Sequence, residues 1–341
     1  MHRRSFLTGI ASLGFVTIVP SFGKPDNSGY LQTVTGRLDL DKAGLILEHE
    51  HVLVDFIGAA KVSPSRYNSE EAFEKILPYL NELKQLGFTT FVECTPQFLG
   101  RDVKLLKRLS IASGLKIITN TGLYGTQNGK YLPEYAFKES PEQLAQRWIA
   151  EWKNGIERTG IKPGFIKISV DKSPIKDFQK NLVKAAAITH LETGLTIASH
   201  TGESEAALEQ INILKESNVH PSAFIWVHAQ SEKNPEKHLQ VVEQGAWASY
   251  DGAAWEKPQR YLELINNLRK HGFMDQALIS HDAGWYHVGE NDGGDFKGFT
   301  EISKQLLPLL KSEGYKDAEI EKLLEVNPAK ALEIKVRKIN L

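Results

Sequence analysis

The chain has 341 residues, of which 41% are hydrophobic and 24% charged, and its 41 basic residues nearly balance its 42 acidic ones. These values are typical of a folded globular protein, and they exclude a disordered chain, a collagen-like chain and a polytopic membrane protein. The sequence contains no block of like charges that would indicate binding to nucleic acid or to an anionic membrane surface. The single cysteine, Cys94, excludes an intramolecular disulfide.

Residues 1–23 have the pattern of an export signal. Arg3 and Arg4 precede a serine and then Phe6 and Leu7, an order that resembles the twin-arginine signal. The apolar run that follows is shorter than the roughly 20 residues that span a bilayer, so no stable membrane insertion is expected. The end at residue 23 is approximate, because the usual pair of small residues at a cleavage site is only partly matched. The sequence predicts export to the periplasm.

From residue 30 onward, short β-rich runs alternate with amphipathic helical runs. Eight strands are predicted, over residues 45–53, 89–94, 116–121, 165–169, 195–200, 224–228, 247–251 and 277–282. Helices are predicted between and after them, over residues 69–86, 102–112, 141–158, 175–192, 204–217, 235–244, 258–270 and 299–312. Eight such units in about 300 residues favour an α/β fold, a single (β/α)₈ TIM barrel, over a doubly wound sheet with a second domain.

Two further elements are expected at the ends of the barrel. Residues 31–44 alternate apolar and polar side chains, which predicts a short N-terminal β-hairpin that caps the barrel before the first strand. Residues 317–332 predict a C-terminal helix. No linker divides the chain, so residues 30–335 are expected to form one domain.

Residues with metal-binding or ionisable side chains stand at the ends of five predicted strands, where a barrel of this kind places its active site. They are His49 and His51 on the first strand, Lys167 on the fourth, His200 on the fifth, His228 on the sixth and Asp282 on the eighth. His49 and His51 are spaced by two, so they share one side of the strand and Glu50 points away. Singly, each residue has an ordinary structural explanation. Their joint occurrence predicts a metal site.

These motifs resemble the phosphotriesterase family of the amidohydrolase superfamily, and the resemblance runs from about residue 36 to residue 331. The most specific motif is the His-Glu-His of the first strand, which ends the segment 44–51. Supporting motifs lie at residues 100–102, 121–124, 164–168 and 279–282. The resemblance implies the same barrel and a metal-dependent hydrolase.

The resemblance also implies the roles of the six residues. His49, His51 and Asp282 would bind one divalent metal ion, and His200 and His228 the second. Lys167 would bridge both ions as an N6-carboxylysine, because a bare ammonium group would be repelled by two dications. Glu93 is the alternative bridge, since some relatives use a glutamate. The donor set favours zinc and is also compatible with cobalt, manganese or iron.

A hydrolase of ester bonds follows from this resemblance. A hydroxide held between the two ions would attack a lactone, a carboxyl ester or an organophosphate triester, and Asp282 would accept the proton. Tyr124, Trp255 and Trp285 are the candidates for substrate contact, and the glycine-flanked aromatic residues after the eighth strand are expected to form a lid. The seventh strand lacks the arginine that lactonases of the family carry, and residues 251–254 do not plainly supply a His/Asp proton relay.

Two alternatives to this hydrolase stay open. A mononuclear amidohydrolase, of the deaminase or amidase type, would use only His49, His51, His200 and Asp282. A metal-stabilised binding protein would keep the site without catalysis. The expected partner is a small-molecule substrate rather than nucleic acid, and the resemblance is compatible with a homodimer.

Overall fold

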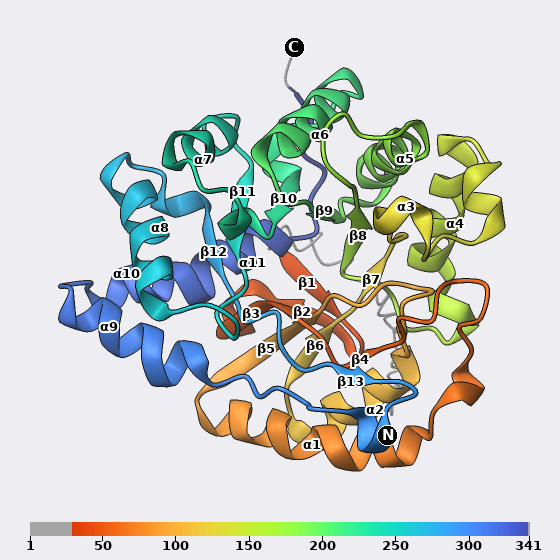
Figure 1. Ribbon diagram of the computed structural model, residues 1–341, viewed down its shortest axis with the longest axis horizontal. Helices are drawn as coiled ribbons and strands as arrows, with labels where there is room; N and C mark the ends of the chain where they lie inside the picture. The colour runs from red at the N-terminus through yellow and green to blue at the C-terminus, as the bar shows by residue number, and fades with distance from the viewer. Residues whose placement is uncertain (1–28, 340–341) are drawn as a thin grey trace, which may run out of the picture.

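The computed structural model describes residues 29–339, so the predicted export signal lies outside the described residues. Parallel strands occupy the middle of the molecule, and helices form a ring around them (Figure 1). Within residues 29–339, no helix combines the length and the apolar character that crossing a bilayer requires.

The central strands form two parallel ladders in chain order. One ladder joins β3 (Leu45–Glu50), β5 (Phe88–Glu93) and β6 (Lys116–Ile118). The other joins β7 (Asn120–Thr121), β8 (Phe165–Ser169), β9 (Thr196–His200), β10 (Phe224–Val227), β11 (Trp247–Tyr250) and β12 (Ala277–Ile279). Within each ladder, successive strands therefore pair in the order of the chain, as expected for successive βαβ units.

Hydrogen bonds also connect β3 with the segment that directly follows β12. The backbone N–H of His49 donates to Ser280 Oγ at 3.0 Å, and the N–H of Asp282 donates to the His49 carbonyl at 3.1 Å. The third predicted strand is split at Thr119 into β6 and β7. An α/β fold with parallel strands is thus present, and the arrangement is consistent with the predicted (β/α)₈ barrel.

The helices of the outer ring are α1 (Ser69–Gln85), α2 (Val103–Ser113), α4 (Pro141–Asn154), α5 (Asp177–Thr193), α6 (Ser204–Glu216), α7 (Pro235–Val242), α8 (Pro258–Lys270) and α9 (Leu307–Ser312). Seven of them agree with the predicted ones to within a few residues, and α9 begins eight residues later than predicted. Asn68 begins α1, because its side chain accepts the N–H of Glu70 at 2.9 Å. The inner face of α1 buries Ile76, Leu80 and Leu83, and this burial fixes the helix against the strands.

Three helical features differ from the predictions. A short helix, α3 (Thr126–Gly129), lies in the loop after β7. A π-helical turn at Ile302–Leu306 precedes α9. The predicted terminal helix is present as α10 (Asp317–Glu321) and α11 (Asn327–Leu332), with a second π-helical turn at Lys322–Val326 between them.

The predicted hairpin is present as the antiparallel pair β1 (Tyr30–Thr33) and β2 (Gly36–Asp39). Leu31 and Leu38 are buried in one apolar cluster with Phe165, which begins β8. The N–H of Val34 donates to the carbonyl of Ile117 at 2.8 Å. The hairpin therefore packs against the strands on the side away from their carboxyl ends.

A buried histidine joins α5 to the C-terminal segment. His190 Nδ1 lies 2.8 Å from the Leu195 carbonyl, and Nε2 accepts the N–H of Arg337 at 2.9 Å. Burial lowers the pKa of His190 from its ordinary value of 6.5. Because protonation would remove the acceptor for Arg337, the folded protein favours the neutral ring.

The stability of the fold should therefore depend on pH through His190. The pKa of His190 in the folded protein lies below 6.5, so the neutral ring contributes its full stabilisation of the fold above pH 6.5. This contribution is lost as the pH falls. Between pH 7 and pH 5 we expect the wild type to lose more unfolding free energy than His190→Gln. Urea denaturation at each pH measures this difference. The exposed His271, changed to Gln, is the control and should behave like the wild type.

Candidate metal centre

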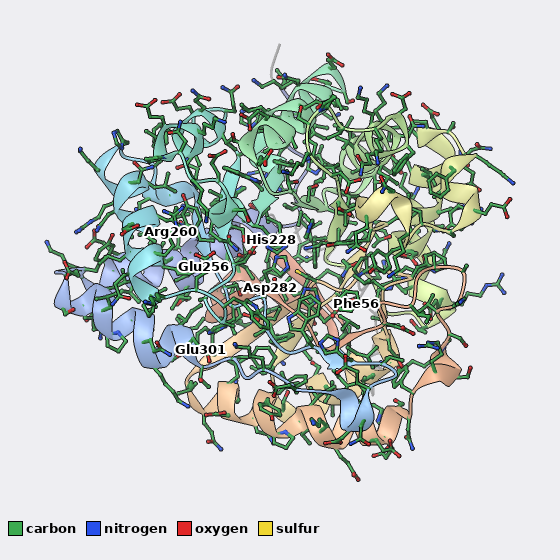
Figure 2. All side chains as sticks on the ribbon, viewed as in Figure 1. Phe56, His228, Glu256, Arg260, Asp282 and Glu301 are labelled. Atoms are coloured by element: carbon green, nitrogen blue, oxygen red, sulfur yellow. The ribbon has the colours of Figure 1, made fainter. Side chains whose placement is uncertain are left out.

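The six predicted ligand residues come together at the carboxyl ends of the strands. They are His49 on β3, His51 just after it, Lys167 on β8, His200 at the end of β9, His228 after β10 and Asp282 after β12. Figure 2 shows His228 and Asp282 near the centre of the ring, with Phe56 at one side of them. Residues that are far apart in sequence thus share one small volume.

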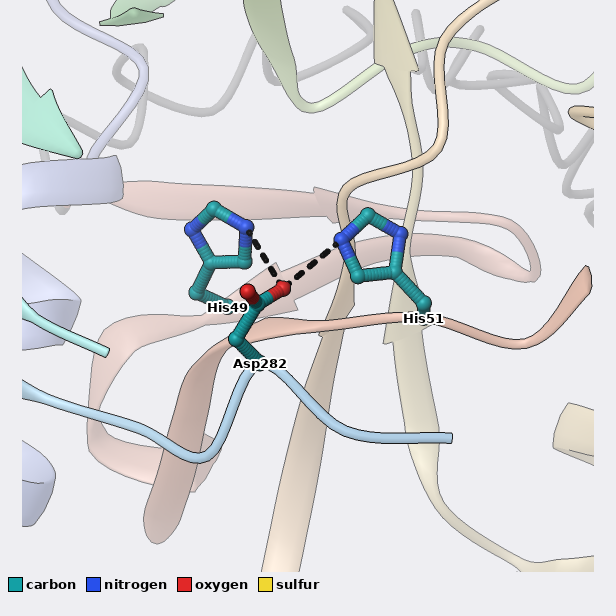
Figure 3. A group of neighbouring side chains, drawn as sticks. All are labelled: His49, His51 and Asp282. Atoms are coloured by element: carbon teal, nitrogen blue, oxygen red, sulfur yellow. Dashed lines mark ion pairs between the residues drawn. The ribbon is translucent and has the colours of Figure 1, made fainter. Parts of the chain in front are cut away.

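His49, His51 and Asp282 form the first part of the cluster, and their potential ligand atoms all lie within 4.8 Å of one another (Figure 3). Asp282 Oδ1 is 3.1 Å from His51 Nε2 and 3.6 Å from His49 Nε2. This oxygen is buried, yet neither contact has the geometry of a hydrogen bond. Two imidazole nitrogens and one carboxylate oxygen that face one another in this way are the donor set of a divalent cation. The residues therefore fit a metal ion.

His200 and His228 form the second part of the cluster. His228 Nε2 lies 2.7 Å from His200 Nδ1, and the rings of His228 and His49 are 5.2 Å apart. Lys167 lies beside the first part of the cluster, with its Nζ 3.3 Å from His49 Nε2, and its side chain is buried. The two groups of predicted ligands are thus contiguous.

Most of these imidazoles are neutral. Burial, reinforced by the Lys167 ammonium group, lowers the pKa of His49 to about 3. Burial also lowers the pKa of His51, and burial together with the charge of His228 holds the pKa of His200 well below its usual range. A neutral imidazole is the form that binds metal, so the cluster is electrostatically prepared for a cation.

Asp251, which follows β11, orients His228 and His49 through the Nδ1 atoms of their rings. Burial opposes the charge of Asp251, but the neighbouring rings of His228 and His49 hold its pKa well below the usual range. Its Oδ1 lies 2.7 Å from His228 Nδ1, and Oδ2 is 3.3 Å from His49 Nδ1. In turn, the carboxylate outweighs burial and raises the pKa of His228. A carboxylate behind a metal-binding histidine fixes its tautomer and ring orientation.

The sequence analysis did not assign Asp251 to the metal site. Asp251 follows the end of a strand, as His228 does, and this position was the available signal. Its partner could not be identified before β10 and β11 were known to be neighbours.

Asp251→Asn should weaken metal binding. The asparagine keeps the size of the side chain but loses the charge that His228 and His49 face, so we expect metal affinity to fall about 10–100-fold. Competition with a coloured chelator measures the affinity. The exposed Asp275, paired with Lys322 at the surface, provides the control Asp275→Asn. Equal affinities for the two variants would contradict the prediction.

Glu50 lies on the other side of β3 and holds the turn that carries Asp282. Its Oε1 accepts Ser280 Oγ at 2.7 Å and the N–H of His281 at 2.9 Å, and its Oε2 accepts the N–H of Ala283 at 3.0 Å. Asp282 itself has φ of 52°, which a strand cannot accommodate. The eighth strand therefore ends at Ile279, not at Asp282 as predicted.

The predicted substrate-contact residues border the cluster. Tyr124 Oη lies 2.9 Å from His200 Nδ1, and the ring of Trp285 stacks on His51 with a centroid distance of 4.0 Å. The side chain of Trp255 is 59% exposed, and its indole N–H donates to the Asp282 carbonyl at 2.7 Å. Phe56, which the sequence analysis did not select, is 40% exposed and stacks on Trp285. The side of the cluster formed by Trp285 and Phe56 is therefore aromatic.

The segment expected to form a lid is tied down near its start. β13 (Tyr286–His287) pairs in parallel with β4 (Leu53–Val54), which follows His51. The first predicted strand, residues 45–53, is thus divided into β3 and β4, and β13 was not predicted, because such short pairs have no sequence periodicity.

Glu93, considered as an alternative bridge between two metal ions, faces the loop that carries His51. Its Oε1 accepts the N–H of Thr95 at 3.1 Å and that of Val52 at 3.4 Å. Thr95 Oγ1 in turn lies 2.8 Å from His51 Nδ1. Burial raises the pKa of Glu93 to about 7. Glu93 thus holds the backbone next to His51 and the threonine that contacts the His51 ring.

Comparison with known proteins identifies the family. The model of the phosphotriesterase family matches residues 29–332. The chain belongs to the phosphotriesterase family. A phosphotriesterase homology protein of Escherichia coli (strain K12) is 26% identical over 86% of this chain and 99% of its own length. An aryldialkylphosphatase of Saccharolobus solfataricus is 28% identical over 84% of this chain and 94% of its own.

Solved structures and further relatives agree with membership of the phosphotriesterase family. A variant of an organophosphorus hydrolase from Deinococcus radiodurans superimposes with a TM-score of 0.80 at 26% identity, covering 89% of this chain and 97% of that one. An N-acetyltaurine hydrolase of Dictyostelium discoideum is 25% identical over 90% of this chain and 98% of its own length. The relatives of this chain therefore include proteins named for ester and for amide substrates.

Proposed function

We propose that this member of the phosphotriesterase family is a binuclear metal-dependent hydrolase of lactones, carboxyl esters or organophosphate triesters. The observation that carries the proposal is the convergence of four histidines, one lysine and one aspartate at the strand ends. The orphaned Oδ1 of Asp282, buried between two imidazole nitrogens, supports a cation at this point.

In this proposal the six residues would hold two divalent ions, favoured to be zinc. His49, His51 and Asp282 would bind one ion, and His200 and His228 would bind the other. Lys167, carboxylated at Nζ by carbon dioxide, would supply an anionic bridge between them. When bound, the ions activate water at neutral pH and polarise the ester oxygen of the substrate.

The protein contributes positioning and proton transfer. Asp282 is ionised, because the surrounding histidines outweigh burial and lower its pKa. Its carboxylate accepts the proton that water releases as it attacks the substrate. Tyr124, beside His200, is placed to orient the bound ester, and burial keeps its hydroxyl protonated by raising its pKa well above the ordinary value. The rings of Trp285 and Phe56 offer an apolar surface for the acyl or leaving group.

Metal analysis combined with a substrate panel tests the proposal. Protein purified after growth with zinc should contain about two ions per chain and should hydrolyse at least one lactone, carboxyl ester or phosphotriester. A content of about one ion would support a mononuclear enzyme. Metal-replete protein without turnover on the whole panel would support a metal-stabilised binding protein.

An amide substrate is the second candidate, and the relatives named as N-acetyltaurine hydrolases favour it. The panel should therefore include N-acyl amino acids and N-acyl sulfonates. A kcat/KM for an amide above that of every ester would assign the chain to amide hydrolysis at the same metal centre.

We also propose that the chain closes as a (β/α)₈ barrel and is exported through its twin-arginine signal. The contacts of β3 with the segment after β12 support closure. The twin-arginine route carries folded proteins, which suits a metal centre assembled before export. The homodimer stays a prediction.

A further inference from the structure

The backbone carbonyl of Asp282 accepts two indole N–H groups. Trp255 Nε1 and Trp285 Nε1 each lie 2.7 Å from this oxygen. Trp255 comes from the loop after β11, and Trp285 comes from the loop after β12. A carbonyl oxygen has two lone pairs, so side chains from two different loops use both of them.

Trp255 extends a row of backbone hydrogen bonds beyond the end of β11. The N–H groups of Ala253 and Ala254 donate to the carbonyls of Ser280 and His281 at 3.1 and 3.2 Å. The carbonyl of Asp282 is the next acceptor in this row, and it accepts the indole N–H of Trp255 instead of a backbone N–H. The loop is thereby bound along the segment that carries the proposed metal ligand.

The conformation of Asp282 explains why such support is needed. Its φ of 52° lies in the left-handed region, which a residue other than glycine adopts only when its surroundings enforce it. Its N–H is held by the His49 carbonyl at 3.1 Å, and the two indoles hold its carbonyl. The peptide orientation fixed in this way determines where the carboxylate lies relative to His49 and His51.

Each tryptophan has a second contact that ties it to the site. The Trp285 ring stacks on His51 at 4.0 Å. Lys297 Nζ lies 4.2 Å from the centroid of the Trp255 ring, and Lys297 belongs to the loop after β12, where its backbone exchanges two hydrogen bonds of 2.9 Å with Gly284. Trp255 is 59% exposed, so burial of apolar surface does not account for a tryptophan at this position.

We propose that Trp255 and Trp285 are positioning residues that together hold Asp282 in its ligand conformation. The inference rests on the proposed function, in which Asp282 binds metal and accepts a proton. Loss of one N–H leaves the other donor on the same oxygen. Loss of both releases the peptide, so the effects of the two changes must be strongly non-additive.

The test uses Trp255→Phe, Trp285→Phe and the double variant in the full-length protein. Phenylalanine keeps an aromatic ring for the contacts with Lys297 and His51 but removes the N–H. Trp247→Phe is the matched control, because Trp247 Nε1 donates to the Ser222 carbonyl at 2.9 Å at the beginning of β11, far from the strand ends that carry the site. The readouts are the rate of metal release to a chelator, the visible spectrum of the cobalt-loaded protein, and separate kcat and KM values.

Each single variant should release metal about threefold faster and lose about threefold in kcat. The double variant should change both quantities about 100-fold, well beyond the product of the single effects, and should alter the cobalt spectrum. Trp247→Phe should match the wild type. A double variant equal to the wild type, or equal to the product of the single effects, would overturn the inference. Wild-type protein that binds no metal would overturn the proposed function and this inference with it.

Discussion

Lys167→Ala is expected to lose activity by more than about 10³-fold and to retain about one metal ion or fewer per chain. The side chain is buried beside His49, and its carboxylated form is the only bridge in the proposed centre. Without a bridging anion, two dications at short separation repel each other. Elemental analysis and initial rates on the best substrate of the panel measure both effects.

Small carboxylates should partly reverse this loss. Acetate or propionate can enter the space left by the lysine side chain and supply the missing oxygen ligands, so both metal content and activity should rise with their concentration. Lys153→Ala is the control, because this lysine lies at the surface and pairs with Glu192 at 2.8 Å. Full activity of Lys167→Ala without added carboxylate would refute the bridge.

Asp282→Asn should lower kcat by about 10²–10⁴-fold while the protein stays folded. The amide is nearly the same size as the carboxylate, so packing around β12 is retained. It cannot accept a proton, and it is a weaker ligand beside His51. Steady-state kinetics measure the loss, and thermal unfolding verifies that the fold is intact.

A second aspartate in the same loop provides the control for Asp282→Asn. Asp292 is exposed and pairs with Lys75 at 2.8 Å, so Asp292→Asn removes the same charge without touching the cluster. It should leave kcat unchanged. If Asp282→Asn also kept its activity, the proton acceptor would have to be another group. If the wild type showed no turnover and Asp282→Asn bound the same ligand with unchanged affinity, a binding protein would be indicated.

Much of the site could be predicted because the ends of buried strands can be recognised in a sequence. Runs of β-branched and apolar residues bury the parallel strands on both faces, and each run stops where a polar side chain such as His200 appears. The spacing of His49 and His51 then fixes which side of β3 they share. Agreement among several strands is enough to predict the cluster.

The features that escaped prediction depend on contacts between segments distant in sequence. Asp251 gains its role only because β10 and β11 are neighbours and place it behind His228. The end of β12 before Asp282 depends on Glu50, which binds the following turn from the other side of β3. The π-helical turns are invisible in the sequence, since one extra residue in a turn hardly changes the spacing of apolar side chains.

The position of the proposed ligands along the chain has a consequence for biosynthesis. Since His49 and His51 precede Asp282 in the sequence, they leave the ribosome well before Asp282 and the two tryptophans that bind its carbonyl. The nascent polypeptide therefore cannot complete the proposed metal site until the segment after β12 has been synthesised. Acquisition of metal would follow that step, and a product truncated before Asp282 would lack one of the proposed ligands.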